Sequence, residues 1–270
     1  MKARISLFIV LVALASLFNM TVMAQDVARE DTVIFDIDAS DVPNPTNFNW
    51  LVPGTNRNQG AHQGMWEPLF ILNYESGEIQ PWLATSFDSN ETADVWTLNL
   101  REGVHWSDGE AFNSDDVMFT IGMLLDDETA TLAEAANMQQ WIDSIEQIDE
   151  LTVQFNLKAP NPRFQLDHFS VRIWGSVLIM PELIWAGQDP FTFTFYDEEQ
   201  GWPIGTGPYT LTLAESNRFV WDRDDNWWGA EAGFNDLPEP LRLIFQITGS
   251  EENKGQLMAN GELDSVMNIT

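Results

Sequence analysis

The sequence predicts an α/β protein, because strand patterns and helix patterns follow one another along it. Residues 96–101 alternate between apolar and polar side chains, the period of a strand with one buried face. After two turns, Asn113 or Ser114 can cap a helix whose apolar residues recur at helical spacing. Residues 241–260 show the same order, an apolar strand and then a helix.

Turn residues set the limits of the elements in the first half of the chain. Gly103 and Gly109 can each adopt a positive φ, so the segment between them is expected to be a short strand held by two reversals. The expected elements are a strand at 32–38, a loop up to Gln63, an apolar segment at 65–72, an extended piece between Gly77 and Pro81, strands at 96–100 and 104–106, and a helix at 113–124.

The second half is predicted to contain hairpins, a tight backbone path marked by glycines and one further capped helix. Strict alternation from 151 to 157, preceded by residues 141–148 and an acidic turn at 149–150, indicates a hairpin. The expected elements are the hairpin at 141–157, a helical turn at 181–185, a tight backbone path at Gly205 and Gly207, paired strands joined around Ser216 and Asn217, a strand at 241–247, a helix from Ser250 to Asn260, and a strand beginning at Leu263.

The first residues have the pattern of an export signal. Lys2 and Arg4 precede an apolar run at 5–18, and small residues allow cleavage after Ala24. The run is too short to cross a bilayer as an anchor. The chain has no Cys, so it carries neither a disulfide nor a lipid-modified Cys. A soluble periplasmic or extracellular protein is expected, with residues 1–24 as the signal peptide.

The charge is strongly acidic, with a formal net value of −30. Removal of Lys2 and Arg4 with the signal lowers the basic residues from 12 to 10, against 42 acidic ones. Such a surface repels nucleic acid and anionic lipid. It is explained either by saline surroundings that screen the self-repulsion or by a function that attracts cations.

Three blocks of the sequence together resemble a known family. They are WTLNLREGVHWSDGEAFNSDDVMFT (96–120), PIGTGPYTLT with NRFVWDRDDNWWG (203–212 and 217–229), and LRLIFQITGSEENKGQLMANGELDSV (241–266). In this order and behind a signal peptide, they are similar to the family 5 extracellular solute-binding proteins of ABC importers. That group includes oligopeptide-, dipeptide-, nickel- and oligosaccharide-binding members.

The resemblance implies a periplasmic-binding-protein-like (type II) fold of two α/β lobes with an additional small α+β domain. Residues 25–64 and 186–270 would form the first lobe and 65–185 the additional domain, while the second lobe is missing from this chain, which resembles an amino-terminal fragment. The implied partners are a small-molecule ligand and the ABC permease subunits in the membrane. We expect a monomer that closes on an oligopeptide, or alternatively on a cello-, xylo- or manno-oligosaccharide.

The resemblance also identifies candidate ligand-binding residues. The loop from Gly54 to Asn58 faces the cleft in this family, and so does the segment after Asp264. Trp50 could stack on a sugar ring, or it could be a packing residue. The candidates are therefore Trp50, Thr55, Asn56, Arg57, Asn58, Met267 and Asn268.

Catalytic and metal-binding patterns are weak. His62, His105 and His168 lack the paired spacing of a metal site, and there is no Gly-x-Ser-x-Gly motif or phosphate loop. The 12 Trp and 42 acidic residues leave a secreted glycoside hydrolase as a remote alternative, although no segment singles out a pair of carboxylates. We expect no enzymatic activity, no metal and no cofactor.

Overall fold

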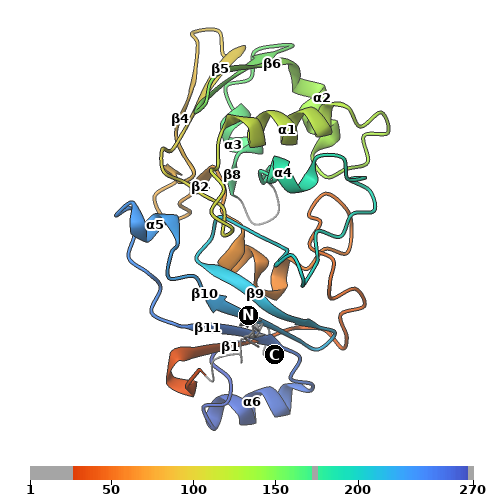
Figure 1. Cartoon of the computed structure of the whole chain (residues 1–270), viewed down its shortest axis with the longest axis vertical. Helices are drawn as coiled ribbons and strands as arrows, with labels where there is room; N and C mark the ends of the chain where they lie inside the picture. Colours follow the sequence, from red (N-terminus) through yellow and green to blue (C-terminus); the bar gives the residue numbers. More distant parts are fainter. Residues whose placement is uncertain (1–26, 172–175, 267–270) are drawn as a thin grey trace, which may run out of the picture.

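The computed structural model describes residues 27–171 and 176–266, and it stacks three sheets along the long axis of the molecule (Figure 1). In Figure 1 the sheet with β1 lies at the bottom, the sheet with β5 and β6 lies at the top, and β2 and β8 lie between them. Strand orders are β1-β11-β10-β9 below, β3-β2-β8 in the middle and β4-β5-β7-β6 above.

The elements are short. In chain order they are η1 (Arg29–Asp31), β1 (Thr32–Asp36), η2 (Arg57–Met65), β2 (Phe70–Leu72), β3 (Ile79–Pro81), β4 (Ala84–Ser89), β5 (Val95–Leu100), α1 (Ser114–Leu125), α2 (Ala135–Trp141), β6 (Ile142–Asp149), β7 (Thr152–Leu157), α3 (Phe164–His168), β8 (Ser170–Val171), α4 (Glu182–Trp185), β9 (Tyr209–Glu215), β10 (Arg218–Arg223), α5 (Trp228–Glu231), β11 (Arg242–Gln246) and α6 (Glu251–Ala259).

The lower sheet mixes parallel and antiparallel pairing. β1 runs parallel to β11, and β10 pairs antiparallel with both β11 and β9. Phe35 and Phe245 are register partners whose rings stack with their centroids 4.6 Å apart. Such aromatic cross-strand pairs stabilise the sheet beyond their burial.

A buried ion pair attaches α6 to the end of β1. The Lys254 ammonium lies 2.7 Å from the Asp36 carboxylate, and their side chains are 5% and 0% exposed. Asp38 lies 3.4 Å away, and Ser250 caps the helix by accepting from the Asn253 amide. The carboxylates beside Lys254 raise its pKa, with the hydrogen bond to Asp36 as the largest cause. The ammonium is therefore charged wherever the protein is folded near neutral pH.

The upper sheet shows why the block at 96–120 is regular. β5 lies between β4 and β7, and its residues alternate between buried and half-buried positions. α1 begins in a capping box, in which Asn113 accepts from the Asp115 amide and Asp116 accepts from the Asn113 amide. The Asp116 carboxylate also accepts from the indole of Trp106, so the turn and the helix of the block are joined.

An aromatic cluster forms the centre of the upper part. The ring of Phe87 lies 5.2–5.9 Å from those of Trp96, Phe155, Phe164 and Phe169. All five side chains are at most 6% exposed. These five aromatic residues are therefore packing residues.

Most of the expected elements are confirmed. They include the first strand, the strand at 96–100, the helix capped by Asn113, the hairpin at 141–157, the turn at 182–185, the paired strands around Ser216, and the helix capped by Ser250. The lobe and domain boundaries stay a prediction, and the signal peptide lies outside the described residues.

Three expectations were wrong or incomplete. Residues 104–106 are not a strand, because only His105 forms a bridge, to Ala111. The expected loop up to Gln63 contains η2, a π-helical turn that begins at Arg57. Ser265 forms a bridge with Phe35, but no longer strand is seen up to residue 266. The Phe35–Ser265 bridge joins residues 230 positions apart, so local pattern could not show where that pairing ends.

The glycines at 205 and 207 allow two backbone segments to cross in contact. The Gly207 amide donates to the Met65 carbonyl over 2.9 Å. A Cβ at residue 205 would collide with the Met65 carbonyl oxygen, and one at 207 would collide with that of Gly64. The requirement here is close approach, since neither glycine has a positive φ.

Replacement of Gly205 or Gly207 by Ala should lower the free energy of unfolding by about 2 kcal/mol or more, because the added methyl meets backbone atoms that cannot move independently. Gly122→Ala in α1 is the matched control, since no atom lies within 4 Å of its added Cβ. It should be neutral or stabilising. Chemical denaturation checks both, and equal stability of Gly207→Ala and Gly122→Ala would contradict the crossing.

Glu67 joins the lower and middle layers next to this crossing. Its carboxylate accepts from the indole N–H of Trp82, just after β3, at 2.9 Å and from that of Trp228, in α5, at 2.8 Å. Burial raises the pKa of Glu67 to about 7, although hydrogen bonds from Trp228, Trp82 and other groups act in the opposite direction. The folded protein therefore favours the protonated acid more than the unfolded chain does.

This shift predicts a pH-dependent contribution to stability. The contribution of Glu67 is fully present below its unfolded pKa of 4.5 and is lost as the pH rises to about 7. The free energy of unfolding of Glu67→Gln, taken relative to that of the parent protein, should therefore rise by roughly 3 kcal/mol between pH 4.5 and 7.5. Denaturation curves at several pH values measure this difference. For the exposed control Glu75→Gln, the difference in free energy of unfolding from the parent protein should not change with pH. A pH-independent difference for Glu67→Gln would refute the assignment.

Candidate functional site

Three loops meet around a hollow of about 610 Å³. The first loop follows β1, the second lies between α1 and α2, and the third follows α4. The lining residues are Asn44, Thr46, Asn47, Val52, Pro53, Thr131, Phe191, Thr192, Phe193 and Thr194. The first loop continues directly into residues 54–58, which the sequence predicts to face a ligand.

Two buried asparagines brace the first loop. The Asn56 side-chain amide, 2% exposed, donates to the carbonyls of Asn44, Pro45 and Asn47 at 2.8–2.9 Å. Asn49 is fully buried and donates to the carbonyls of Pro190 and Phe193, 2.8 Å each. These bonds satisfy carbonyls in a segment that has no strand partner. Those of Asn56 stay within the first loop, and those of Asn49 hold the first and third loops together.

An acidic turn positions the second loop. The Asp127 carboxylate accepts from the amides of Thr129, Thr131 and Leu132 at 2.7–2.9 Å. Burial acts to raise the pKa of Asp127, but these bonds and that from the Thr129 hydroxyl outweigh it and lower the pKa to about 2. The carboxylate stays ionised at any physiological pH. The turn thus presents Thr131 at the hollow as a fixed group.

The lining is neutral and rich in hydrogen-bonding groups. Hydroxyl and amide side chains alternate with apolar ones, and no lining residue is charged. Phe191 is 46% exposed, so a large part of its ring is open to solvent at the edge of the hollow. Such a surface suits a neutral ligand that offers donors and acceptors along its length together with apolar faces.

The predicted loop residues are placed in different surroundings. Asn58 is exposed and Thr55 is half-buried, with a buried hydroxyl that has no partner among the described residues. Arg57 is half-buried and donates to the Trp50 carbonyl at 2.7 Å. Burial lowers the pKa of Arg57, and the charge of Glu134 partly offsets this. Asn56 is bonded inward, as described above, and supports the loop.

Trp50 is 1% exposed, and its indole N–H points at the sulfur of Met180. This burial favours the packing alternative over stacking on a sugar. Met267 and Asn268 lie outside the described residues. A ligand-binding role for all seven candidates stays a prediction.

Sequence reasoning missed most of the hollow. Residues 44–47 were expected to be plain loop, and neither Thr131 nor the segment 191–194 was singled out. The alternation of Phe and Thr in FTFT (191–194) is the one local signal that marks a polar and aromatic surface. The three loops are distant in sequence, so only folding brings them together.

Within residues 27–171 and 176–266, no group of three or more His, Cys, Asp or Glu is arranged to hold a metal ion. The same residues include no helix with the length and apolar character needed to span a membrane.

Comparisons with known proteins agree on one family. Residues 78–270 match the family model described as bacterial extracellular solute-binding proteins, family 5 middle. A periplasmic alpha-galactoside-binding protein of Rhizobium meliloti is 26% identical over 82% of this chain and 34% of its own length. A di/tripeptide-binding protein of Pseudomonas aeruginosa is 32% identical over 62% of this chain and 34% of its own length.

Solved structures give the same result. A mannohexaose-bound periplasmic oligopeptide-binding protein from Thermotoga maritima is 26% identical with a TM-score of 0.72, over 88% of this chain and 42% of that chain. The fold is therefore that of the periplasmic binding proteins. The chain spans about a third of the length of the curated relatives named above.

The braces predict opposite results for two neighbouring asparagines. Asn56→Ala should lower the free energy of unfolding by about 2 kcal/mol, because it leaves buried carbonyls without a donor. Asn58→Ala, at an exposed position, should change it by less than about 0.5 kcal/mol. Urea denaturation provides the measurement. A neutral Asn56→Ala would show that Asn56 does not brace the loop.

Proposed function

We propose a function from the premise that the chain belongs to the bacterial extracellular solute-binding proteins of family 5. Members of this family are periplasmic, and the relatives are substrate-binding transport proteins. In our proposal the protein is the extracytoplasmic substrate-binding component of an ABC transporter, and it binds an oligopeptide for import. It catalyses no reaction.

The neutral hollow is the observation that carries this proposal. A peptide backbone presents one donor and one acceptor at each residue, which the Asn and Thr side chains of the lining can match. The exposed face of Phe191 can pack against an apolar side chain of the peptide. Peptide-binding relatives at 30–32% identity add support.

The proposal includes the finer expectations from the sequence. The protein is exported with cleavage after Ala24 and acts as a monomer. Residues 25–64 and 186–270 form the first lobe and residues 65–185 the additional domain. Closure of a second lobe over the hollow would exclude water from the ligand, and the closed form would be presented to the permease subunits.

An oligosaccharide is the second candidate ligand, and a specific observation favours it. The hollow offers no charged group for the termini of a peptide, whereas sugar hydroxyls need none. Mannohexaose occupies one structural relative and another relative is named for α-galactosides. The two candidate ligands use Phe191 differently. Its ring would stack on the face of a sugar, whereas it would pack against an apolar side chain of a peptide. A glycoside hydrolase remains the remote alternative.

Calorimetric titration of the complete gene product against di- to pentapeptides and against cello-, xylo- and manno-oligosaccharides tests the proposal. We expect micromolar binding of one class and no hydrolysis of either. Peptide binding supports the first candidate and sugar binding the second. Binding of neither class would refute both, and sugar turnover would support the hydrolase.

Phe191→Ala should weaken binding of the ligand so identified by about tenfold, because it removes one open aromatic face. The midpoint of thermal unfolding should hardly change, since the ring is already 46% exposed. Tyr74→Ala is the control, because Tyr74 is an exposed aromatic residue in the turn between β2 and β3. Equal affinities of the two variants would place the ligand elsewhere.

A further inference from the structure

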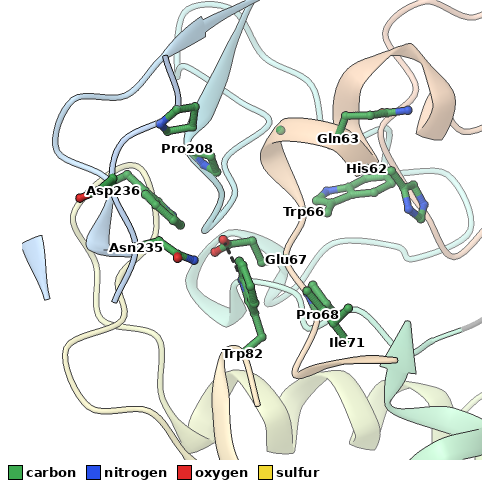
Figure 2. Close-up of a pocket in the computed structure, with 13 residues that line it drawn as sticks. His62, Gln63, Trp66, Glu67, Pro68, Ile71, Trp82, Pro208, Asn235 and Asp236 are labelled. Atoms are coloured by element: carbon green, nitrogen blue, oxygen red, sulfur yellow. Dashed lines mark hydrogen bonds between the residues drawn. The ribbon is translucent and has the colours of Figure 1, made fainter. Parts of the chain in front are cut away.

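A second cavity, of about 520 Å³, opens beside Glu67 (Figure 2). One wall comes from Trp82 and residues between 62 and 71 (62–64, 66–68 and 71). The other comes from Pro208, Trp227 and residues 235, 236 and 238. It shares no lining residue with the neutral hollow. In Figure 1 the α5 region that borders it lies on the left, whereas the loop that follows β1 lies on the right. We call it the Glu67 cavity.

Indole rings form much of the wall. Trp66, Trp82 and Trp227 line the Glu67 cavity, and the first two are partly exposed. Figure 2 shows Trp66 on one side and Trp82 below the Glu67 carboxylate. Trp82 is held in place by Phe234, which meets it edge-on at 5.0 Å between centroids. Indole faces attract cations more strongly than the other aromatic side chains do.

The charged groups of the wall are acidic. Glu67 and Asp236 both line the cavity, and neither Lys nor Arg does. Asn235 and Asp236 lie across the cavity from Trp66 (Figure 2). Both Glu67 oxygens already accept indole N–H groups, so Glu67 offers charge more than free acceptor sites. The cavity thus combines negative charge with aromatic surface.

One protein cation already uses the neighbouring aromatic cluster. The Arg101 guanidinium lies 4.2 Å from the ring centre of Phe234 and 6.0 Å from that of Trp228. It also donates to the Trp82 carbonyl at 2.7 Å. Arg101 does not line the cavity, so it leaves the exposed surfaces of Trp66 and Trp82 for another group.

From this geometry we propose that the Glu67 cavity is a second binding site, which takes a small quaternary ammonium ion. Such an ion donates no hydrogen bonds, so it matches a wall whose half-buried carboxylate, that of Glu67, already accepts two indole N–H groups. Its methyl groups contact the indole faces, and its charge is balanced by Glu67 and Asp236. A metal ion fits less well, because the described residues provide no cluster of three metal-ligating side chains.

The net charge of −30 attracts any cation weakly. A test must therefore distinguish specific binding in the cavity from this non-specific attraction. Choline and its neutral isostere 3,3-dimethyl-1-butanol differ only in nitrogen against carbon at the trimethyl centre. We expect choline to bind the complete gene product at least about tenfold more tightly than the isostere, by calorimetry in 0.15 M salt. Equal affinities, or no binding of choline up to about 10 mM, would overturn the proposal.

Matched variants locate the site. Trp66→Leu and Asp236→Asn should each weaken choline binding by about fivefold or more. Glu239→Gln removes the same charge from an exposed residue that does not line the cavity, and it should leave the affinity unchanged. Both positions 236 and 239 are exposed, so both variants should fold. Equal weakening by Asp236→Asn and Glu239→Gln would show a surface field effect and overturn the assignment.

Dependence on pH tests the role of Glu67. Choline binding should strengthen between pH 5.5 and 8, because the ionised carboxylate attracts the cation, and Glu67→Gln should make the profile flat. The other charged or titratable groups near Glu67 are His62 and Asp236, which line the same cavity, and Arg101, which packs on the ring of Phe234. Desolvation of His62, whose ring packs against Trp66, and the charge of Arg57 lower its pKa to about 4. His62 is thus neutral in this range, and a flat parent profile would refute the role of Glu67.

This site is independent of the proposed import function. Saturation with choline should leave the affinity for the peptide or sugar unchanged, because the two cavities share no residue. Phe191→Ala should likewise leave choline binding unchanged. Loss of choline binding in Phe191→Ala would mean that choline occupies the neutral hollow, and it would overturn the second site.

Discussion

The close crossing of residues 64–65 and 205–207 is the constraint on which the arrangement of the layers depends. The Gly207 amide bonds the Met65 carbonyl, and the Gly205 carbonyl accepts from Ser107 in the upper part. The Thr206 carbonyl accepts from the Trp227 indole in the lower part. One short segment thus contacts three regions through its backbone. Because backbone atoms have little freedom to adjust, small residues are required there.

The crossing also positions the Glu67 cavity. Glu67 follows Met65 by two residues, so its carboxylate is carried into the junction between Trp82 and Trp228. η2, which ends at Met65, is held against the lower sheet by another bond, because the indole N–H of Trp221 in β10 donates to the Gln59 carbonyl. The loop preceding η2 is braced in turn by Asn56 and Asn49. One continuous stretch of chain therefore contributes to both cavities: residues between 44 and 53 line the neutral hollow, and residues from 62 onward, after the start of η2, line the Glu67 cavity.

The two cavities differ in chemistry although they share this support. The hollow is lined by neutral amides, hydroxyls and two Phe rings, and it suits a ligand that is bound by hydrogen bonds along its length. The Glu67 cavity has three indoles and two carboxylates, and it suits a compact cation. An acidic surface can therefore serve solubility generally and recognition locally, depending on which aromatic groups lie beside the carboxylates.

The sequence by itself determined the local elements and the family, since alternation, helical spacing and caps such as Asn113 and Ser250 act between near neighbours. It could not determine which loops would meet. Asn56 was predicted to face a ligand, yet its amide is bonded inward to three carbonyls, while Thr131 and Phe191 reach the hollow from distant loops. Glu67 stands in an ordinary apolar segment, and its role depends on indoles that follow 15 and 161 residues later. Burial and long-range hydrogen bonding are properties of the packed chain, so only the tertiary structure decided them.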